Sequence, residues 1–317
     1  MIVTVTVNPS LDRAVRLAAP IEPGEVQRGL DAREDAGGKG VNVARALRAA
    51  GVGTLAVVPC AQDDPYRLLL EHDGVPVLRI EVQGRTRANL TIADPQGATT
   101  KINMPGPQLS QAEASALVDG VVAAAEGADW VVLAGSLPPG VGDDFYAEIT
   151  AAVRARWGAE SPKIAVDTSG AALASVVATA RPDLIKPNDE ELAELVGAGA
   201  SSGDDDVIAT AIAHAKDLVP ERVAAALVTL GAAGALLVTA DGVLRASAPK
   251  IIVSSTVGAG DSSLAGYLIA AAEGQDDTGR LRRAVAYGAA AASLPGTQIP
   301  GPADIPDWDI PVDSLLP

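Results

Sequence analysis

The chain has 317 residues, of which 48% are hydrophobic and only 3% aromatic, and its formal net charge is −16. This length allows one large α/β domain or two smaller ones, with a core built from Ala, Val, Leu and Ile. The negative charge argues against the broad basic surface that nucleic acid or an anionic membrane would need, so an anionic ligand must meet individually placed cations.

The cysteine and histidine content limits which cellular compartment and which kind of metal site we expect. Cys60 is the only cysteine, which excludes an internal disulfide and favours a reducing, cytoplasmic location. Together with only two histidines, His72 and His214, it makes a His/Cys metal site improbable. The first residues, MIVTVTVNPS, are typical of a strand and too short and uncharged for a signal peptide. No charge-free apolar stretch of membrane-spanning length is present, so we expect neither a membrane nor a nucleic-acid partner.

Short apolar runs alternate with Ala-rich helical patterns along the chain. The expected strands are, in order, Ile2–Val7, Thr54–Pro59, Trp130–Ala134, Lys163–Asp167, Leu184–Lys186, Ala226–Thr229 and Leu236–Val238. The expected helices are Gly40–Ala50, Gln111–Ala125, Asp144–Arg156, Glu190–Gly197, Asp204–Leu218, Ser262–Glu273 and Leu281–Ser293. This alternation predicts a single α/β domain over 1–317, with a parallel sheet covered by helices on both faces.

Two segments interrupt the alternation. Residues 12–32 carry Pro20, Pro23 and Gly24 between extended patches, and residues 84–107 suggest antiparallel strands joined by a DPQG turn. We interpret them as a small inserted sheet that forms a lid or a dimer surface; the alternative is a pair of long surface loops. Residues 300–317 form a Pro- and Asp-rich tail that we expect along the surface, without a chemical role.

The first glycine-rich segment is DAGGKGVNVARALRAAG, residues 35–51. Three glycines surround Lys39 and a helix follows, which is consistent with a ligand cradle: backbone amides, a lysine for a phosphate, and Asn42 for sugar hydroxyls. The alternative is a strand-to-helix turn with a solvated lysine. We favour the cradle because packing alone gives no reason to expose glycine backbone on both sides of a lysine.

A second motif is LIKPNDEEL, residues 184–192, in which a buried strand ends in Lys186 and Pro187 opens a helix. Asn188 and Glu191 are three residues apart and share one helical face. An amide and a carboxylate there could order water around Mg²⁺ near phosphates. Taken alone, ordinary helix capping explains the pair better.

The third motif is VSSTVGAGDSS, residues 253–263. It lacks the last glycine of G-x-G-x-x-G, and no Walker P-loop occurs in the chain. A strand, a glycine turn and a helix N-terminus remain, with free amides pointing at one spot. Asp261 could be a functional carboxylate there, or only a charge that favours the helix dipole.

Taken together, these segments resemble the PfkB carbohydrate kinases of the ribokinase-like family. The resemblance covers nearly the whole chain and rests on six segments in the family's order: GGKGVNVARAL, AGSLPPGV at 134–141, DTSG at 167–170, KPNDEEL at 186–192, VTLGAAGAL at 228–236 and STVGAGDSSLAG. It implies a three-layer α/β/α sandwich with a mainly parallel central sheet and a small β-sheet lid. It also implies ATP and Mg²⁺ as cofactors and a sugar phosphate as substrate. Because the edges of the inserted strands must be covered, we also expect a homodimer formed through the lid.

The resemblance assigns roles residue by residue. Asp261 would be the catalytic base, and the amides of Gly258, Ala259, Gly260 and Asp261 would form an anion hole. The sugar would be held by Asp12, Gly38, Asn42 and Asn103. Its existing phosphate would meet Lys39 and Arg87, with Arg28 a weaker candidate, and Ser136 would line the floor. The triphosphate and its Mg²⁺ would face Lys186, Asn188 and Glu191, the last two through water, and the nucleotide would contact Thr229, Gly231 and Gly288.

The motifs most resemble the branch that acts on ketohexose phosphates. Lys39 in GGKG favours fructose 1-phosphate as the substrate, with tagatose 6-phosphate and fructose 6-phosphate as alternatives. Lys101 stands where relatives often carry an acidic residue, which leaves the choice of sugar open. A non-catalytic sugar-phosphate sensor is the rival from another class, but a sensor has no need of Asp261. A nicotinamide-dependent oxidoreductase would need an early G-x-G-x-x-G, which does not follow the first strand.

Overall fold

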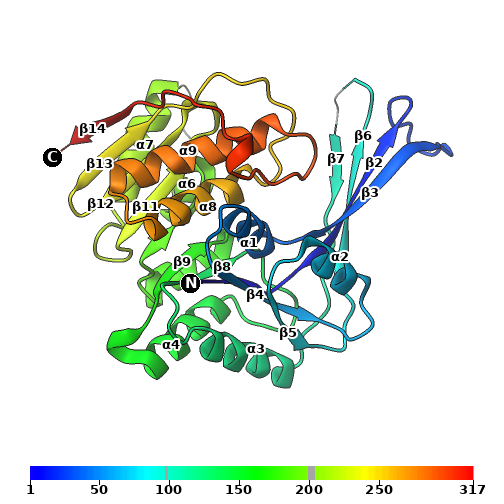
Figure 1. Cartoon of the computed structure of the whole chain (residues 1–317), viewed down its shortest axis with the longest axis horizontal. Helices are drawn as coiled ribbons and strands as arrows, with labels where there is room; N and C mark the ends of the chain where they lie inside the picture. Colours follow the sequence, from blue (N-terminus) through cyan, green and yellow to red (C-terminus); the bar gives the residue numbers. More distant parts are fainter. Residues whose placement is uncertain (97–98, 199–203, 317) are drawn as a thin grey trace.

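The computed structural model describes residues 1–96, 99–198 and 204–316, and within these ranges the chain forms two sheets (Figure 1). The larger sheet has ten strands in the order β14-β13-β12-β11-β10-β9-β8-β1-β4-β5. In chain order, these strands are β1 Ile2–Thr6, β4 Thr54–Cys60, β5 Val77–Glu81, β8 Trp130–Ala134, β9 Lys163–Asp167, β10 Leu184–Ile185, β11 Ala225–Thr229, β12 Ala235–Thr239, β13 Gly242–Ala246 and β14 Val312–Leu316.

The pairs from β5 to β11 are parallel, whereas β12, β13 and β14 add to the sheet antiparallel. All five residues of β1 and of β8 are buried. Continuous apolar runs of this kind suit a sheet that is covered on both faces. The carboxyl ends of the parallel strands lie at one edge, where ligands bind in open α/β sheets.

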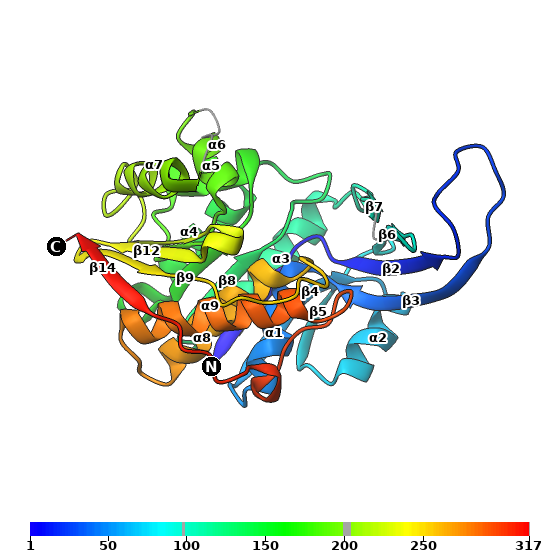
Figure 2. The ribbon, with the colours of Figure 1, turned by 90° about the horizontal axis from the view of Figure 1, so that it is seen from above.

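Helices cover both faces of this sheet, and Figures 1 and 2 show the three layers. One apolar core joins the sheet to side chains of α3 Gln111–Ala124, α4 Phe145–Trp157, α5 Gly170–Thr179, α6 Asp189–Leu195 and α7 Asp204–Lys216. The core on the other face joins it to α1 Lys39–Ala49, α8 Ala259–Ala272 and α9 Asp277–Ser293. The expected α/β/α architecture is therefore confirmed. Among the described residues, no helix is both long and apolar enough to cross a membrane.

The second sheet has the order β3-β2-β6-β7 and is made of β2 Ser10–Leu17, β3 Gly29–Gly37, β6 Arg87–Ala93 and β7 Thr99–Ile102. It projects from the body beside α2 Pro65–Asp73, and its β2–β3 connection extends furthest (Figure 2). The prediction of a separate small sheet is confirmed and the alternative of two surface loops is wrong. The first segment is longer than expected, because its strands run from residue 10 to residue 37 rather than from 12 to 32.

Several elements were not predicted from the sequence. These are α2, α5, β5, β13 and the edge strand β14. The last one corrects the expectation for the tail, because residues 312–316 pair antiparallel with β13 rather than only following the surface. The tail also buries Ile310 in the core beside α8 and α9, at 2% exposure. The prolines of the tail argue against a strand, so the sequence pattern does not predict β14. Its partner β13 is distant in the chain, and a local pattern cannot reveal such a pairing.

Candidate active site

The GGKG turn joins the lid to the body at the start of α1. An added Cβ on Gly37 would lie 2.1 Å from an oxygen of Asp12, and one on Gly38 or Gly40 would lie 2.5 or 2.6 Å from side-chain atoms of Thr6. Gly38 also has a φ of 130°, which only glycine adopts easily. Close packing against β1 and the lid therefore requires these glycines. The expectation that packing gives no reason for glycine on both sides of Lys39 is wrong.

A buried carboxylate, Asp167 at the end of β9, lies between two lysines. Its Oδ1 is 2.8 Å from Lys39 Nζ, and its Oδ2 is 3.3 Å from Lys186 Nζ. Burial by itself would raise the pKa of Asp167, but the two ammonium groups outweigh burial and hold that pKa below its usual range. Burial opposes the charge of Lys39 as well, yet Asp167 and Asp261 leave the pKa of Lys39 raised. Lys39 therefore stays charged beside an ionised Asp167.

Asp261 lies in the first turn of α8, 7% exposed, and its Oδ2 accepts a hydrogen bond of 2.8 Å from Nδ2 of Asn42. Burial and the charge of Asp167 raise the pKa of Asp261 to about 6. Lys39, Asn42 and Lys186 act in the opposite direction and limit the rise. The carboxylate is therefore ionised at neutral pH but is a better proton acceptor than an exposed aspartate.

The glycine turn before Asp261 has a specific shape. Gly258 caps α8 in the left-handed region, with φ 76°, and an added Cβ on Gly260 would lie 3.0 Å from Lys186 Nζ. The amide of Ala259 already donates to the carbonyl of Thr256, at 3.4 Å. The first turn of a helix leaves amides without intrahelical partners, which makes a helix N-terminus suited to an anion. Gly258, Gly260 and Asp261 border the cavity described next, whereas Ala259 borders its neighbour.

One cavity of about 540 Å³ brings together most of the residues that the resemblance selected. It is lined by Asp12, Gly38, Lys39, Asn42, Arg87, Asn103, Ser136, Lys186, Asn188, Glu191, Thr229, Gly258, Gly260 and Asp261. These positions come from the lid, from the GGKG turn, from the ends of parallel strands and from the first turns of α1, α6 and α8. Arg28 is not brought to this cavity, because it lies exposed in the β2–β3 connection.

The lid supplies a polar wall to this cavity. Asp12 accepts hydrogen bonds from Ser10 Oγ at 2.7 Å and from Asn89 Nδ2 at 3.1 Å. Lys101, on β7, also lines the cavity, which places the unusual cation of the lid on the ligand side rather than on an outer surface.

Arg87 fixes the junction between the lid and the body. Its guanidinium donates to the carbonyl of Met104 at 2.8 Å, to the carbonyl of Asn8 at 3.1 Å and to Ser136 Oγ at 3.2 Å. Burial lowers the pKa of Arg87 and the charge of Asp12 opposes this effect. Because carbonyls and a hydroxyl do not neutralise the guanidinium, its charge remains available to an anion in the cavity.

A second cavity, of about 820 Å³, adjoins the first and shares Asn188, Thr229 and Gly260 with it. Gly231 and Gly288, expected to contact a nucleotide, both line it, together with apolar residues such as Val253 and Val285. Gly288 has a packing reason as well, because an added Cβ would lie 2.2 Å from Ser263 Oγ on α8.

Asn188 and Glu191 form a capping box at the start of α6. The amide of Glu191 donates to Asn188 Oδ1 at 2.7 Å, and the amide of Asn188 donates to Glu191 Oε2 at 2.9 Å. The structure therefore contains the helix cap that was the alternative interpretation of this pair. The cap leaves one carboxylate oxygen of Glu191 and the side-chain NH₂ of Asn188 for other partners. Within the described residues there is no group of three or more His, Cys, Asp and Glu that could hold a metal. The donor set fits a Mg²⁺ ion that keeps its waters and is bound mainly by phosphates.

Sequence reasoning assigned no role to Asp167, although the segment DTSG was among the resembling motifs. The sequence signal that could have identified Asp167 is an aspartate at the last position of a buried strand. Two polar residues follow it, Thr168 and Ser169, and both line the cavity. Asn8 was missed as well; its Nδ2 donates to the carbonyl of Pro105 at 3.0 Å and ties β1 to the lid.

Comparison with known proteins identifies the family of this chain. Residues 6–304 match the model of the pfkB family carbohydrate kinases. The chain is 37% identical over 306 residues to a 1-phosphofructokinase of Rhodobacter capsulatus, covering 95% of this chain and 93% of the relative. It is 36% identical over 274 residues to a 1-phosphofructokinase of Xanthomonas campestris pv. campestris, with coverages of 84% and 83%. A solved structure of phosphofructokinase-2 from Escherichia coli in complex with substrates and products is 32% identical, with a TM-score of 0.85 and 96% coverage of both chains.

The family match spans nearly the whole chain, and the matched range contains the residues that line both cavities. The chain therefore belongs to the pfkB family of carbohydrate kinases and is an ATP-dependent sugar-phosphate kinase.

Proposed function

We propose that this kinase transfers the γ-phosphoryl group of ATP to fructose 1-phosphate and forms fructose 1,6-bisphosphate. The observation that carries the proposal is the meeting of the two cavities at Gly260, with Asp261 on the side of the smaller one. A nucleotide in the larger cavity and a sugar phosphate in the smaller one would have their reacting ends at this junction. Phosphoryl transfer depends mainly on such positioning and on cations.

In the proposed reaction, the free hydroxymethyl oxygen of the sugar attacks the γ-phosphorus in line. The new P–O bond forms as the bond to the bridging oxygen of ADP breaks, and Asp261 accepts the proton of the hydroxyl. The amides of Gly258 and Gly260 stabilise charge on the transferring group, and Lys186 lies close to Gly260 as a cation. A pKa of about 6 leaves Asp261 ionised, as this role requires.

The smaller cavity suits a phosphorylated sugar. Asp12, Gly38, Asn42 and Asn103 supply polar groups for hydroxyls, while Arg87, Lys39 and Ser136 are the proposed partners of the phosphate already present. Arg87 is half-buried and tied to carbonyls, so a dianion there would meet a cation that is already oriented. Lys39 is held by its ion pair with Asp167, so its ammonium group would also meet the phosphate as a cation that is already oriented.

ATP and Mg²⁺ are the proposed cofactors. The triphosphate would pass Lys186 and Asn188, and Thr229, Gly231 and Gly288 would border the nucleoside in the larger cavity. Mg²⁺ would supply charge neutralisation to the phosphates, with Glu191 and Asn188 holding its waters.

The sugar is tested by comparing kcat/KM for fructose 1-phosphate, tagatose 6-phosphate and fructose 6-phosphate with MgATP. We expect fructose 1-phosphate to be preferred, in line with the names of the R. capsulatus and X. campestris relatives. A clear preference for either 6-phosphate would contradict the proposal; an ATP-dependent 6-phosphofructokinase isozyme 2 of Escherichia coli is 32% identical over 94% of both chains. Binding of all three sugars without ADP formation would instead identify a sensor.

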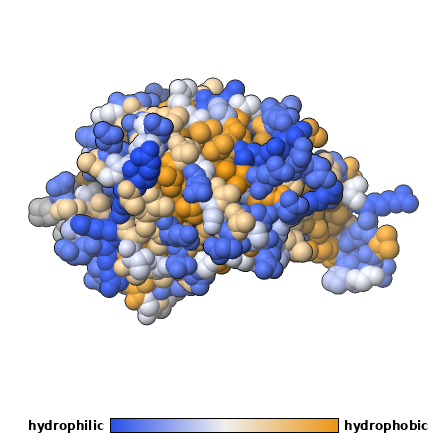
Figure 3. All heavy atoms as spheres, turned by 90° about the horizontal axis from the view of Figure 1, so that it is seen from below, coloured by the Kyte–Doolittle hydropathy of each residue, from blue (hydrophilic) through white to orange (hydrophobic). Residues whose placement is uncertain are grey.

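We also propose that the lid forms the interface of a homodimer. Strands β3 and β7 are the edges of the small sheet, and exposed apolar side chains lie on or beside it, among them Val26 at 98% and Leu30 at 62% exposure. In Figure 3 the lid projects at the right with hydrophobic atoms among hydrophilic ones. Unpaired edges and exposed apolar groups favour association.

Light scattering after size exclusion tests the interface. Val26→Asp or Leu30→Asp should yield a monomer, whereas Leu68→Asp, at a position on α2 that is as exposed as Leu30, should leave the dimer intact. A monomeric wild-type protein would contradict the proposal.

A cytoplasmic location completes the proposed function, and the free, buried Cys60 is consistent with a reducing compartment.

A further inference from the structure

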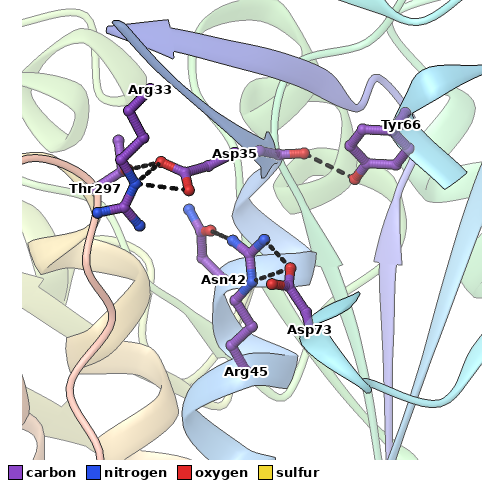
Figure 4. A network of polar contacts seen from close by, with 8 residues as sticks. Arg33, Asp35, Asn42, Arg45, Tyr66, Asp73 and Thr297 are labelled. Atoms are coloured by element: carbon purple, nitrogen blue, oxygen red, sulfur yellow. Dashed lines mark hydrogen bonds and ion pairs between the residues drawn. The ribbon is translucent and has the colours of Figure 1, made fainter. Parts of the chain in front are cut away.

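Behind the proposed base lies a chain of polar contacts that runs away from the cavity, from α8 through α1 to α2. Asn42 donates to Asp261 from its Nδ2, and its Oδ1 accepts a hydrogen bond of 3.1 Å from Arg45 Nη1. Arg45 in turn donates from Nε to Asp73 Oδ2 at 2.9 Å, and its Nη2 pairs with the same carboxylate oxygen. Figure 4 shows the guanidinium between Asn42 and Asp73.

The two neighbours of Asn42 both require the same orientation of its amide. A guanidinium can only donate, so it can face only the oxygen, and an ionised carboxylate can only accept, so it can face only the NH₂ group. If the amide turned over, its NH₂ would meet Arg45 and its oxygen would meet Asp261, and both hydrogen bonds would become repulsive contacts. Asn42 lies on α1, so Arg45, three residues later, reaches it along the same helical face.

Arg45 does not itself belong to the substrate site. Of these described residues, Asn42 lines the 540 Å³ cavity, whereas Arg45 and Asp73 line a separate cavity of about 290 Å³. Their side chains are 17% and 25% exposed, so water competes only weakly with their ion pair. The hydrogen-bonded path from Arg45 to the reacting atoms therefore passes through the Asn42 amide.

We propose that Arg45, held by Asp73, is a positioning residue that locks the Asn42 amide with its NH₂ toward Asp261 and thereby orients the catalytic carboxylate. This inference rests on the proposed role of Asp261 as the base. Without Arg45 only Asp261 holds the amide in this orientation, so the direction of the carboxylate is less well defined and the hydrogen bond to its ionised form is weaker.

The pH dependence has a definite sign. The charged groups that face Asp261 are Asp167, Lys39 and Lys186, and Asn42 is its neutral hydrogen-bond donor. The Asn42 hydrogen bond favours the ionised carboxylate, so its loss raises the pKa of Asp261. The acidic limb of the kcat profile should then move to higher pH when the amide is released.

The test compares Arg45→Met with Arg48→Met, which removes the same charge from an exposed position of the same helix. We expect Arg45→Met to lower kcat by about tenfold to a hundredfold, with the KM for ATP nearly unchanged and the acidic limb at higher pH. Arg48→Met should match wild type in all three. Asp73→Asn, which weakens the hold on the guanidinium, should produce a smaller change in the same direction, and it replaces Arg45→Met if that variant does not fold.

A double-mutant cycle separates positioning from general destabilisation. If Arg45 acts through the amide, Arg45→Met should cause no further loss of kcat in an Asn42→Ala background, whereas independent effects would multiply. The inference would be overturned if the effects of Arg45→Met and Asn42→Ala on kcat multiply. It would also be overturned if Arg45→Met has the kcat and the acidic pH limb of the wild type. Asp261→Asn is measured in parallel: near-normal turnover there would refute the proposed base, while an inactive Asp261→Asn beside a normal Arg45→Met would refute only the role of Arg45.

Discussion

Replacing the proposed base by its amide, Asp261→Asn, should make the ligand-free protein more stable while it abolishes turnover. The carboxylate is 7% exposed, and burial and Asp167 raise its pKa from an ordinary value of 3.8 to about 6. A raised carboxyl pKa means that the folded state holds its proton more tightly than the unfolded state does. The ionised group therefore reduces stability as the pH rises from 3.8 to 6, and the full cost remains at higher pH. Each pKa unit corresponds to about 1.4 kcal/mol, so at pH 8 the variant should gain about 3 kcal/mol.

The gain is measured by thermal unfolding at pH 8 and pH 5, without ligands. With an unfolding entropy of about 2.1 cal/mol/K per residue over 317 residues, 3 kcal/mol corresponds to a rise in Tm of about 4.5 °C at pH 8. About half of that rise should remain at pH 5, because the wild-type carboxyl is then mostly protonated in the folded state. Asp143→Asn, at an exposed position, should show no such gain. An Asp261→Asn variant that is less stable than wild type at pH 8 would refute the reasoning, because it would mean that Lys39 and Lys186 stabilise the charge more than burial and Asp167 oppose it.

Three further outcomes follow from the same structure. The kcat/KM of the wild type should rise with pH through about 6, because Asp261 must be ionised to accept a proton, and a flat profile between pH 5 and pH 8 would contradict its role. Asp167→Asn should move that limb to lower pH, because it removes a negative charge that raises the pKa of Asp261; a shift to higher pH would count against the assigned cause. Gly266→Ala should reduce stability by about 1 to 3 kcal/mol in urea unfolding, since its Cβ would lie 2.4 Å from the carbonyl oxygen of Arg283 on α9, while Gly53→Ala, where no atom lies within 4 Å, should leave the urea midpoint nearly unchanged.

Local sequence patterns were sufficient for most of the body of the fold. Buried strands such as Trp130–Ala134 and Lys163–Asp167 were predicted with the bounds that the structure has. The helix expected from Gln111 begins there, and Ser110 directly before it forms a capping box with Glu113. Continuous apolar runs and helix caps are local signals, and a parallel sheet follows from their alternation. The elements that were missed depend on distant partners: β14, for example, is a strand because β13 offers it an edge.

For the candidate site, too, some features follow from the sequence and others only from the tertiary structure. The sequence by itself determined the motifs and, through the family resemblance, the residue types expected to bind a sugar phosphate and ATP. Only the tertiary structure decided which groups meet: Lys39 and Lys186, 147 positions apart, pair with one carboxylate, Asp167, and the amide of Asn42 reaches Asp261 from another helix. Such pairings, and the pKa of about 6 that they leave on Asp261, arise from burial and from distances between charges, which no stretch of sequence contains.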